Sequence, residues 1–449
     1  MTKDLLLISK VFSANSPGRV EKFSRRVELL ADRGWRTHIL TPQEPGYDRI
    51  ADFAPDADPS PEIHVTDSLF TNLRAWYYDL YYGSGGGDQS SESGSEETDF
   101  SSKIDILNSF TATIKQGVVS AKPWLFIPDG WIGWYPYALS SGRKILTDTQ
   151  IDVIYSACSP YTAHLVAAKL SEEFDVPFVA SFRDPWVNNP LIATSPIWKI
   201  ASKRLERKVI NRAEKVVIYR GWFPDNGTYL YETYPNHREK IHTLSYVGFD
   251  PVDFERHPVS NDGPFTIIHA GNFYGGDYSP ETFLTGLRTA IDRGVIPPDD
   301  IRVYFLGKLA DEYRNLISSL NLSSVVEWKG VVPYETVLDH LEKSDVGLWV
   351  MGDEKSYQSN VPSKLFDYIG ASIPVLAVVP DGQAAEFVRE NQLGTVSDPT
   401  NPREVADRLQ ELYKQHQTES LKIDIDTTRF NRQETLSTFE ELLCECVKQ

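Results

Sequence analysis

Residues 345–388 alternate between apolar runs that suit short buried strands and amphipathic patterns that suit helices. The two apolar runs, Val346–Val350 and Pro374–Val379, flank a helical pattern that begins at Pro362 and ends at Gly370. Two buried strands joined through a helix are typical of a parallel sheet, because a parallel pair needs a long crossover connection. The stretch therefore predicts a doubly wound α/β domain.

The start of that helix carries polar side chains that suit an anionic ligand. In doubly wound folds, the loop between a parallel strand and the next helix binds anions, because free backbone N–H groups and the helix dipole point toward it. Ser363 adds a hydroxyl, Lys364 a mobile ammonium, and Asp367 an acceptor for a sugar hydroxyl. The alternative is an ordinary capped helix with a solvated lysine. We expect a site for a diphosphate with a sugar attached.

Composition narrows the class of protein. The chain has 449 residues, enough for two or three domains with full cores. Its 45 Lys and Arg against 63 Asp and Glu give a net charge of −18, which argues against general affinity for nucleic acids. Three cysteines are too few for a disulfide framework or a closed zinc site. The N-terminal apolar run is too short for a signal peptide and no stretch is long enough to span a membrane, so we expect a cytoplasmic protein.

The first half of the chain repeats the alternation of strands and helices. Residues 4–41 form a strand–helix–strand opening without a G-x-G-x-x-G fingerprint, which disfavours an NAD-type enzyme. A later buried strand, Pro177–Ser181, ends just before Arg183 and Asp184. Charged residues at the carboxyl end of a parallel strand face the ligand crevice. These two are therefore the candidates in this half for work on the substrate, with a structural ion pair as the alternative.

Two segments of the first half suggest contact with a membrane surface. Residues 122–137 are dense in Trp, Tyr and Phe, which suits lipid contact or, equally, a packed lid between helices. The predicted helix 196–213 has an apolar stripe at Ile197, Ala201, Leu205 and Val209. Its basic residues lie off that stripe, where they would face anionic lipid or simply solvent: Lys199, Lys203, Arg204, Arg207, Lys208 and Arg212. Residues 83–99 are acidic and rich in Gly and Ser, which predicts a disordered insertion.

Six segments of the chain have a characteristic order and spacing. They are the Asn15–Gly18 loop, SPYTAHL (Ser159–Leu165), FRDPW (Phe182–Trp186), HAGNFYGG (His269–Gly276), WKGVVPYE (Trp328–Glu335) and VPSKLFDYIGASIPVLAVVP (Val361–Pro380). With this set the chain resembles family 4 glycosyltransferases of the GT-B class. The resemblance implies two Rossmann-like doubly wound domains that face a central cleft. Residues 1–250 would form the acceptor-side domain, residues 251–429 the nucleotide-sugar domain, and the helix 430–449 would cross back to the first.

The resemblance also implies roles for residues of the second domain. Gly271 and Asn272 would line the phosphate loop, and the segment after Gly330 would meet the nucleotide base. Lys364, with Ser363 beside it, would neutralise the diphosphate leaving group, whose departure builds negative charge in the transition state. Asp367 would meet the ribose or sugar hydroxyls. Transfer would retain the anomeric configuration and need no obligatory metal or cofactor, since the nucleotide sugar is a co-substrate.

From the first domain, Gly18 and Arg19 would approach the donor phosphate, with Gly18 allowing close backbone approach. Arg183 and Asp184 would orient the acceptor, which we expect to be lipid-linked or a saccharide in the synthesis of cell-surface polysaccharide. His164 lies inside a helical pattern, where a packed histidine is the better interpretation.

The chain departs from the family pattern at several positions. Where the family often has two glutamates separated by seven residues, this chain has Ser359 and Asp367, and where a basic residue is common after Tyr-Gly-Gly it has Asp277 and Tyr278. Two alternatives remain open, and these gaps favour the second of them. One is a sugar-nucleotide epimerase on the same frame, and the other is a non-catalytic partner subunit.

Overall fold

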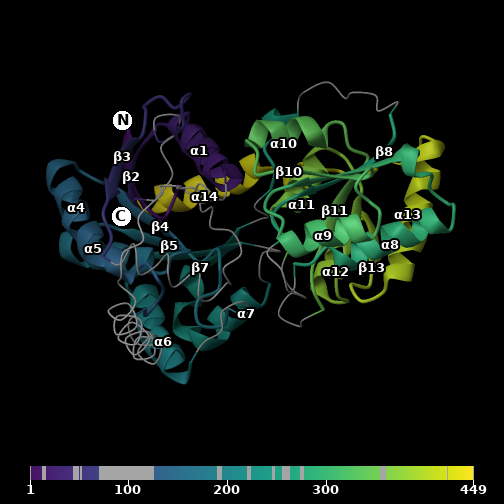
Figure 1. The fold of residues 1–449 in the computed structure, drawn as a ribbon. Helices are drawn as coiled ribbons and strands as arrows, with labels where there is room; N and C mark the ends of the chain where they lie inside the picture. The colour runs from purple at the N-terminus through teal and green to yellow at the C-terminus, as the bar shows by residue number, and fades with distance from the viewer. Residues whose placement is uncertain are drawn as a thin grey trace, which may run out of the picture.

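The computed structural model describes residues 2–12, 17–43, 50, 53–69, 126–189, 195–219, 224–244, 248–254, 263–273, 278–353, 361–421 and 423–447. They form two α/β domains, each built on its own parallel sheet (Figure 1). The predicted acidic insertion at 83–99 and Trp124 lie outside the described residues. Among the helices that are described, none is long and apolar enough to cross a bilayer.

The first domain has a seven-stranded sheet in the order β3-β2-β1-β4-β5-β6-β7, with every neighbouring pair parallel. Its strands are β1 (Lys3–Ile8), β2 (Trp35–Pro42), β3 (Glu62–Thr66), β4 (Val153–Ala157), β5 (Phe178–Ser181), β6 (Lys215–Tyr219) and β7 (Ile241–Leu244). Its helices are α1 (Pro17–Ala31), α4 (Tyr135–Asp148), α5 (Thr162–Phe174), α6 (Pro196–Arg212) and α7 (Pro224–Thr233), with short 3₁₀ turns at Ile132–Trp134 and Pro235–Lys240.

Alternate residues of the central strands supply two separate cores in this domain. Leu6 and Ile8 of β1 pack on the face covered by α4, α5 and α6, whereas Leu5 and Leu7 pack on the face covered by α1. Because β1 is buried on both faces, its sequence is a continuous apolar run, as expected for an interior strand of a parallel sheet.

The second domain has a six-stranded sheet in the order β10-β9-β8-β11-β12-β13, again with parallel pairs. Its strands are β8 (Phe265–Ala270), β9 (Ile301–Leu306), β10 (Val326–Gly330), β11 (Val346–Val350), β12 (Val375–Val378) and β13 (Gly394–Ser397). Its helices are α8 (Glu281–Asp292), α9 (Asp311–Ser319), α10 (Tyr334–Leu341), α11 (Lys364–Gly370), α12 (Gln383–Glu390) and α13 (Pro402–Gln417), with 3₁₀ turns at Pro251–Phe254, Pro298–Asp300 and Thr428–Phe430. Helices α8, α9 and α13 cover one face, and α10, α11 and α12 the other.

The C-terminal helix α14 (Arg432–Val447) returns to the first domain, as expected. Figure 1 shows this yellow helix beside the purple helix α1, although the two stand at opposite ends of the sequence. Its residues Leu436, Phe439 and Leu443 belong to the core on the α1 face, and the Phe439 ring contacts Tyr155 with centroids 4.8 Å apart. The predicted doubly wound two-domain fold is thus confirmed.

Three edge or near-edge strands, β3, β7 and β13, are not predicted from the sequence. The sequence does not reveal these strands because they are short and peripheral. They carry polar or half-exposed residues and no continuous apolar run. The predicted apolar stripe of α6 is also shifted. Ile197 is exposed and Val209 is buried as predicted, while the rest of the buried face is formed by Trp198, Ser202, Glu206 and Ile210. Glu206 fits there because the hydroxyls of Tyr229 and Tyr234 donate hydrogen bonds to it.

The aromatic segment before α4 is a packed element where the structure describes it. Phe126, Trp131 and Trp134 are all buried, and the Trp134 indole N–H donates a 2.7 Å hydrogen bond to the Thr66 hydroxyl. The lid interpretation therefore holds for these residues, and they offer no surface to lipid. His164 is likewise buried, stacked on Phe182 and hydrogen bonded to Ser156, so the prediction of a packed histidine is confirmed.

Candidate functional site

The centre of the candidate site is a contact between Lys364 and His269 at the carboxyl ends of β8 and β11. Lys364 is the first residue of α11, and its Nζ lies 3.1 Å from His269 Nε2. The histidine is the fifth residue of β8 and is stacked on Phe273, with ring centroids 4.0 Å apart. A residue of α11 and a residue of the HAGNFYGG segment, 95 positions apart in sequence, therefore meet.

The hydrogen bonds of His269 fix which nitrogen carries its proton. His269 Nδ1 lies 3.1 Å from the backbone carbonyl of Leu348, which can only accept a hydrogen bond. The proton therefore sits on Nδ1, and Nε2 accepts from the Lys364 ammonium. Burial, with the adjacent charge of Lys364, lowers the pKa of His269 well below its usual value, so the ring stays neutral.

Lys364 is the cation of this site, but its ammonium loses its proton more readily than that of an ordinary lysine. The residue is half-buried, and burial lowers the pKa of its ammonium to about 7. An anion at this position would favour the charged form and raise the pKa again. Because α11 has only seven residues, the helix dipole contributes little, and Lys364 supplies the charge.

The alternative of an ordinary capped helix does not fit. Ser363 stands at the N-cap position of α11 in helical backbone geometry, and its side chain makes no capping hydrogen bond. Tyr368, one turn further along, holds the helix in place instead. Its hydroxyl accepts a bond from the backbone N–H of Ala270 and donates to the carbonyl of Leu348.

Gly271 makes room for the lysine. A Cβ at this position would lie 3.3 Å from Lys364 Nζ and 3.4 Å from His269 Nε2, and the backbone has φ of +154°, which favours glycine. Gly307, after β9, approaches even more closely, because its Cβ would lie 2.3 Å from the Gly271 carbonyl oxygen. The two glycines allow the loops after β8 and β9 to pack backbone against backbone.

Asn272 and Gly330 connect the loops around the site. The Asn272 side-chain oxygen accepts a 2.7 Å hydrogen bond from the backbone N–H of Lys308, which ties the loop after β8 to the loop after β9. Gly330 ends β10 with φ of +72°, and its carbonyl accepts a 2.7 Å bond from the N–H of Gly307. Both residues therefore hold the loops at the carboxyl edge of the sheet together. Their predicted contacts with phosphate and base remain predictions.

Asp367 lies at the junction of the two domains. One of its oxygens is 3.0 Å from Lys22 Nζ on α1, and the other accepts a 3.2 Å bond from the Tyr334 hydroxyl on α10. Only 7% of the Asp367 side chain and 13% of the Lys22 side chain are exposed. Burial lowers the pKa of Lys22, and the charge of Asp367 opposes that shift. The predicted sugar-binding carboxylate is thus also the partner of a lysine from the first domain.

Arg183 and Asp184 follow β5 at the carboxyl edge of the first sheet and are half-buried. The charge of Arg183 is close enough to act on the Lys22 ammonium, which places it toward the same junction. The backbone carbonyl of Asp184 accepts a hydrogen bond from the buried Cys158 thiol, which fixes the loop. Gly18 and Arg19 belong to the first turn of α1, but their side chains lie outside the described residues, as do Ser359 and Asp277.

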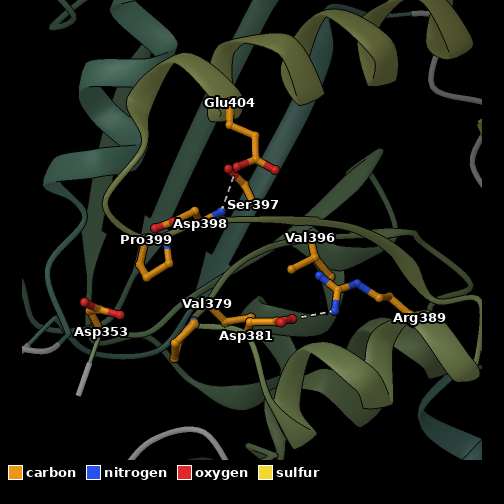
Figure 2. Close-up of a pocket in the computed structure, with 10 residues that line it drawn as sticks. Asp353, Val379, Asp381, Arg389, Val396, Ser397, Asp398, Pro399 and Glu404 are labelled. Carbon is orange, nitrogen blue, oxygen red and sulfur yellow. Dashed lines mark hydrogen bonds and ion pairs between the residues drawn. The ribbon is translucent and has the colours of Figure 1, made fainter. Parts of the chain in front are cut away.

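A separate cavity of about 430 Å³ lies at the carboxyl ends of β12 and β13. Figure 2 shows its carboxylates, with Arg389 directed at Asp381, 2.7 Å away, and Glu404 accepting from the backbone N–H of Asp398. Its one cation is thus paired among the described residues, and its carboxylates repel a diphosphate. None of the predicted site residues lines this cavity.

Three residues of the site are missed by reasoning from sequence. His269, Lys22 and Tyr334 carry polar atoms into the cluster, yet none is among the predicted site residues. His269 has a local signal, since it is the last residue but one of a buried strand that leads into a Gly-rich loop. Lys22 has none, because 345 positions separate it from Asp367.

Comparisons with known proteins agree with this architecture. Residues 286–423 match the family model described as Glycosyl transferases group 1. Among solved structures, sucrose-phosphate synthase from Thermosynechococcus elongatus has a TM-score of 0.61 at 14% identity over 99% of this chain and 98% of that chain. HepE from Anabaena, solved with UDP and glucose, has a TM-score of 0.60 at 14% identity over 99% of this chain and 100% of that chain. The chain has the GT-B fold.

The same fold also occurs in proteins with another activity. UDP-GlcNAc 2-epimerase from Neisseria meningitidis, bound to UDP-GlcNAc, has a TM-score of 0.55 at 14% identity over 99% of this chain and 100% of that chain. Comparison with curated proteins gives no match. The fold alone therefore does not separate a GT-B transferase from a GT-B epimerase, and the side chains of the site must decide.

Proposed function

We propose that this chain is a retaining, family 4-like glycosyltransferase that moves a hexose from a nucleotide-sugar donor to a lipid-linked or saccharide acceptor. The observation that carries the proposal is the Lys364 ammonium, held by His269 beside Gly271 at the carboxyl edge of the second sheet. The match of residues 286–423 to Glycosyl transferases group 1 supports it, because that region includes Lys364.

The chemistry of this site follows from where charge develops. When the bond between the sugar and the nucleoside diphosphate breaks, negative charge builds on the leaving phosphate oxygen, and a fixed cation lowers the barrier. His269 accepts one ammonium N–H of Lys364 and so aims the cation, while the other two N–H groups remain for phosphate oxygens. Neither the neutralisation of the leaving phosphate by Lys364 nor the orientation of Lys364 by His269 needs a metal or a cofactor.

The first domain would hold the acceptor. Arg183 and Asp184 lie on the carboxyl edge of its sheet, where they would orient the acceptor hydroxyl against the donor sugar. A lipid-linked acceptor in polysaccharide synthesis would place the protein in the cytoplasm on a membrane surface. The basic face of α6 suits that placement, because it exposes five cations with two isoleucines: Lys199, Lys203, Arg204, Arg207, Lys208, Ile197 and Ile200.

The first test of the proposal is the melting temperature with UDP-, GDP-, ADP- and dTDP-sugars, beginning with UDP-sugars because HepE is solved with UDP. A ligand at about 100 times its dissociation constant adds about 2.7 kcal/mol, a measurable upward shift. Lys364→Ala should abolish the shift, while Lys203→Ala on the far basic face should keep it. The absence of a shift with every donor would favour a non-catalytic role.

Turnover of the stabilising donor separates the remaining alternatives. A transferase hydrolyses the donor slowly alone and transfers the sugar when an acceptor is added. Isomerisation of the sugar without any acceptor would instead show an epimerase, and binding without chemistry a partner subunit. Retention is read from the anomeric proton coupling of the product.

Membrane contact is tested separately by sedimentation with vesicles of neutral or anionic lipid. Binding to anionic vesicles should fall with added salt, because the Debye length is about 8 Å at physiological ionic strength. Lys203→Glu with Lys208→Glu should abolish it without changing the shift given by the donor. Equal binding by this double variant would remove α6 from the proposal.

A further inference from the structure

Two histidines and a glutamate converge at the outer edge of the first sheet, on the side of that domain away from the second domain (Figure 1). In the register of β2 and β3, His38 pairs with Glu62 and Leu40 pairs with His64, so the three polar side chains share one face of the sheet. His38 Nδ1 lies 3.3 Å from Glu62 Oε2, and His64 Nε2 lies 4.0 Å from the same oxygen. All three atoms fall within 4.8 Å of one another.

The two ring nitrogens that point into this cluster are buried, and their contacts with Glu62 Oε2 do not have hydrogen-bond geometry. Neither His38 Nδ1 nor His64 Nε2 has a hydrogen bond within the part of the chain that the structure describes. The His38 side chain is only 1% exposed, so water does not readily satisfy it. A buried polar atom without a hydrogen bond destabilises the folded state. Two such atoms aimed at one point suggest that something else occupies it.

A second layer of contacts prepares His38 as a ligand. Its other nitrogen, Nε2, lies 2.9 Å from Asp4 Oδ1, and Asp4 accepts two bonds from Arg36, at 2.6 and 3.1 Å. Because the carboxylate of Asp4 accepts, Nε2 carries the proton of the neutral ring, and in that form the Nδ1 lone pair faces the cluster. Histidines that bind metals are oriented in this way by a carboxylate on their far nitrogen.

We propose that His38, Glu62 and His64 bind a divalent transition-metal ion of the zinc class, which fastens the edge strand β3 to β2. Two imidazoles and a carboxylate are a ligand set for Zn²⁺, whereas Mg²⁺ and Ca²⁺ prefer oxygen ligands. In a tetrahedral site with bonds of about 2.0–2.1 Å, ligand atoms are about 3.3 Å apart. The pair of His38 and Glu62 already has this spacing, and His64 needs a small movement inward.

The surroundings suit a site that is open on one side. The Glu62 side chain is 52% exposed, which leaves a fourth position for water. The charge of Lys144 on α4 acts on His64 and opposes a cation, but its own side chain is exposed and free to turn into solvent. Since the cluster is in the first domain, away from Lys364, the ion would support the fold and take no part in sugar transfer.

The test is titration of the full chain, stripped of metal, with Co²⁺ and with Zn²⁺ alone. We expect one Co²⁺ per chain with the visible spectrum of a four-coordinate nitrogen and oxygen site, and a higher melting temperature with Zn²⁺. His64→Gln and Glu62→Gln should each weaken metal binding at least tenfold. Asp4→Asn should lower the metal affinity about 10- to 100-fold, because it replaces the carboxylate that orients His38.

Controls keep the result interpretable. His237→Gln, at a half-buried histidine elsewhere in the first domain that bonds to Asn211, should bind as the native chain does. Glu62→Gln keeps the shape of the side chain, so it serves if His64→Gln does not fold. The proposal would be overturned if the Co²⁺ affinity were unchanged in both His64→Gln and Glu62→Gln, or if the native chain bound no Co²⁺. It would also be overturned if Cys444→Ser lost binding, because the ion would then be held by that thiol.

Discussion

Binding of a nucleotide sugar should be coupled to the uptake of one proton by Lys364. Burial holds the pKa of this lysine at about 7 in the free protein. A diphosphate beside the ammonium stabilises the charged form, so the pKa rises in the complex. At pH 8, only about one free molecule in eleven carries the proton, so binding takes up about 0.9 proton, whereas at pH 6 it takes up about 0.1.

The affinity should follow the same linkage. Above pH 7 the binding-competent, protonated form falls about tenfold per pH unit, so the apparent dissociation constant rises about 100-fold between pH 6 and pH 9. His269 does not contribute, because its pKa lies well below this window. The affinity falls, and does not increase, as the pH rises, because the pKa of the free lysine is depressed. Above pH 7 the lysine has already lost its proton in the free protein, and binding must restore it.

Calorimetry in buffers of different ionisation enthalpy measures this proton uptake directly. The ligand should be a nucleotide sugar, because both of its phosphates are esterified. Lys364→Arg is the matched control, since arginine stays protonated throughout and should bind with no proton uptake. Uptake below about 0.2 proton at pH 8 in the native chain, or equal uptake in Lys364→Arg, would refute the role given to this lysine.

Three further substitutions test packing at the site, in the core of the first domain and between the two domains. Gly271→Ala puts a methyl group against the site lysine on a backbone with φ of +154°, so we expect donor turnover to fall about 10- to 100-fold and the melting temperature to fall as well, as steady-state kinetics and thermal unfolding would show. Phe439→Ala removes a buried ring by which α14 holds the first domain, and should cost about 3–5 kcal/mol in urea unfolding, against less than about 0.5 kcal/mol for exposed Ile200→Ala. Lys22→Ala leaves Asp367 without its cation and should cost about 3–5 kcal/mol, much of which Lys22→Met with Asp367→Asn should restore.

The fold could be predicted from the sequence wherever burial leaves a strong pattern. Strands β1 and β11 are buried on both faces and stand out as apolar runs, and Lys364 stands out because a helix start after such a strand is a local feature. Edge strand β3 has no such pattern, so the cluster of His38, Glu62 and His64 could not be predicted either. A site whose residues lie on a strand that is not predicted cannot be recognised until the register of that strand is known.

Contacts between segments that are distant in the sequence are the second kind of feature that could not be predicted from it. The alignment of His269 with Lys364 depends on the neighbouring positions of β8 and β11 in the sheet, which no local pattern contains. For the same reason, the sequence suggests one role for Asp367 where the structure shows a second. Its carboxylate contacts Lys22 and Tyr334, in addition to any ligand it would bind.

The two roles of Asp367 are compatible, and their combination has a consequence for the domains. A carboxylate has about four acceptor positions, and the contacts with Lys22 and Tyr334 take one on each oxygen, so room remains for a sugar hydroxyl. A hydroxyl bound there would share the carboxylate with a lysine of α1. Binding of a sugar at Asp367 would therefore be coupled to the contact of α1 with the second domain through one side chain, and by linkage each would alter the free energy of the other.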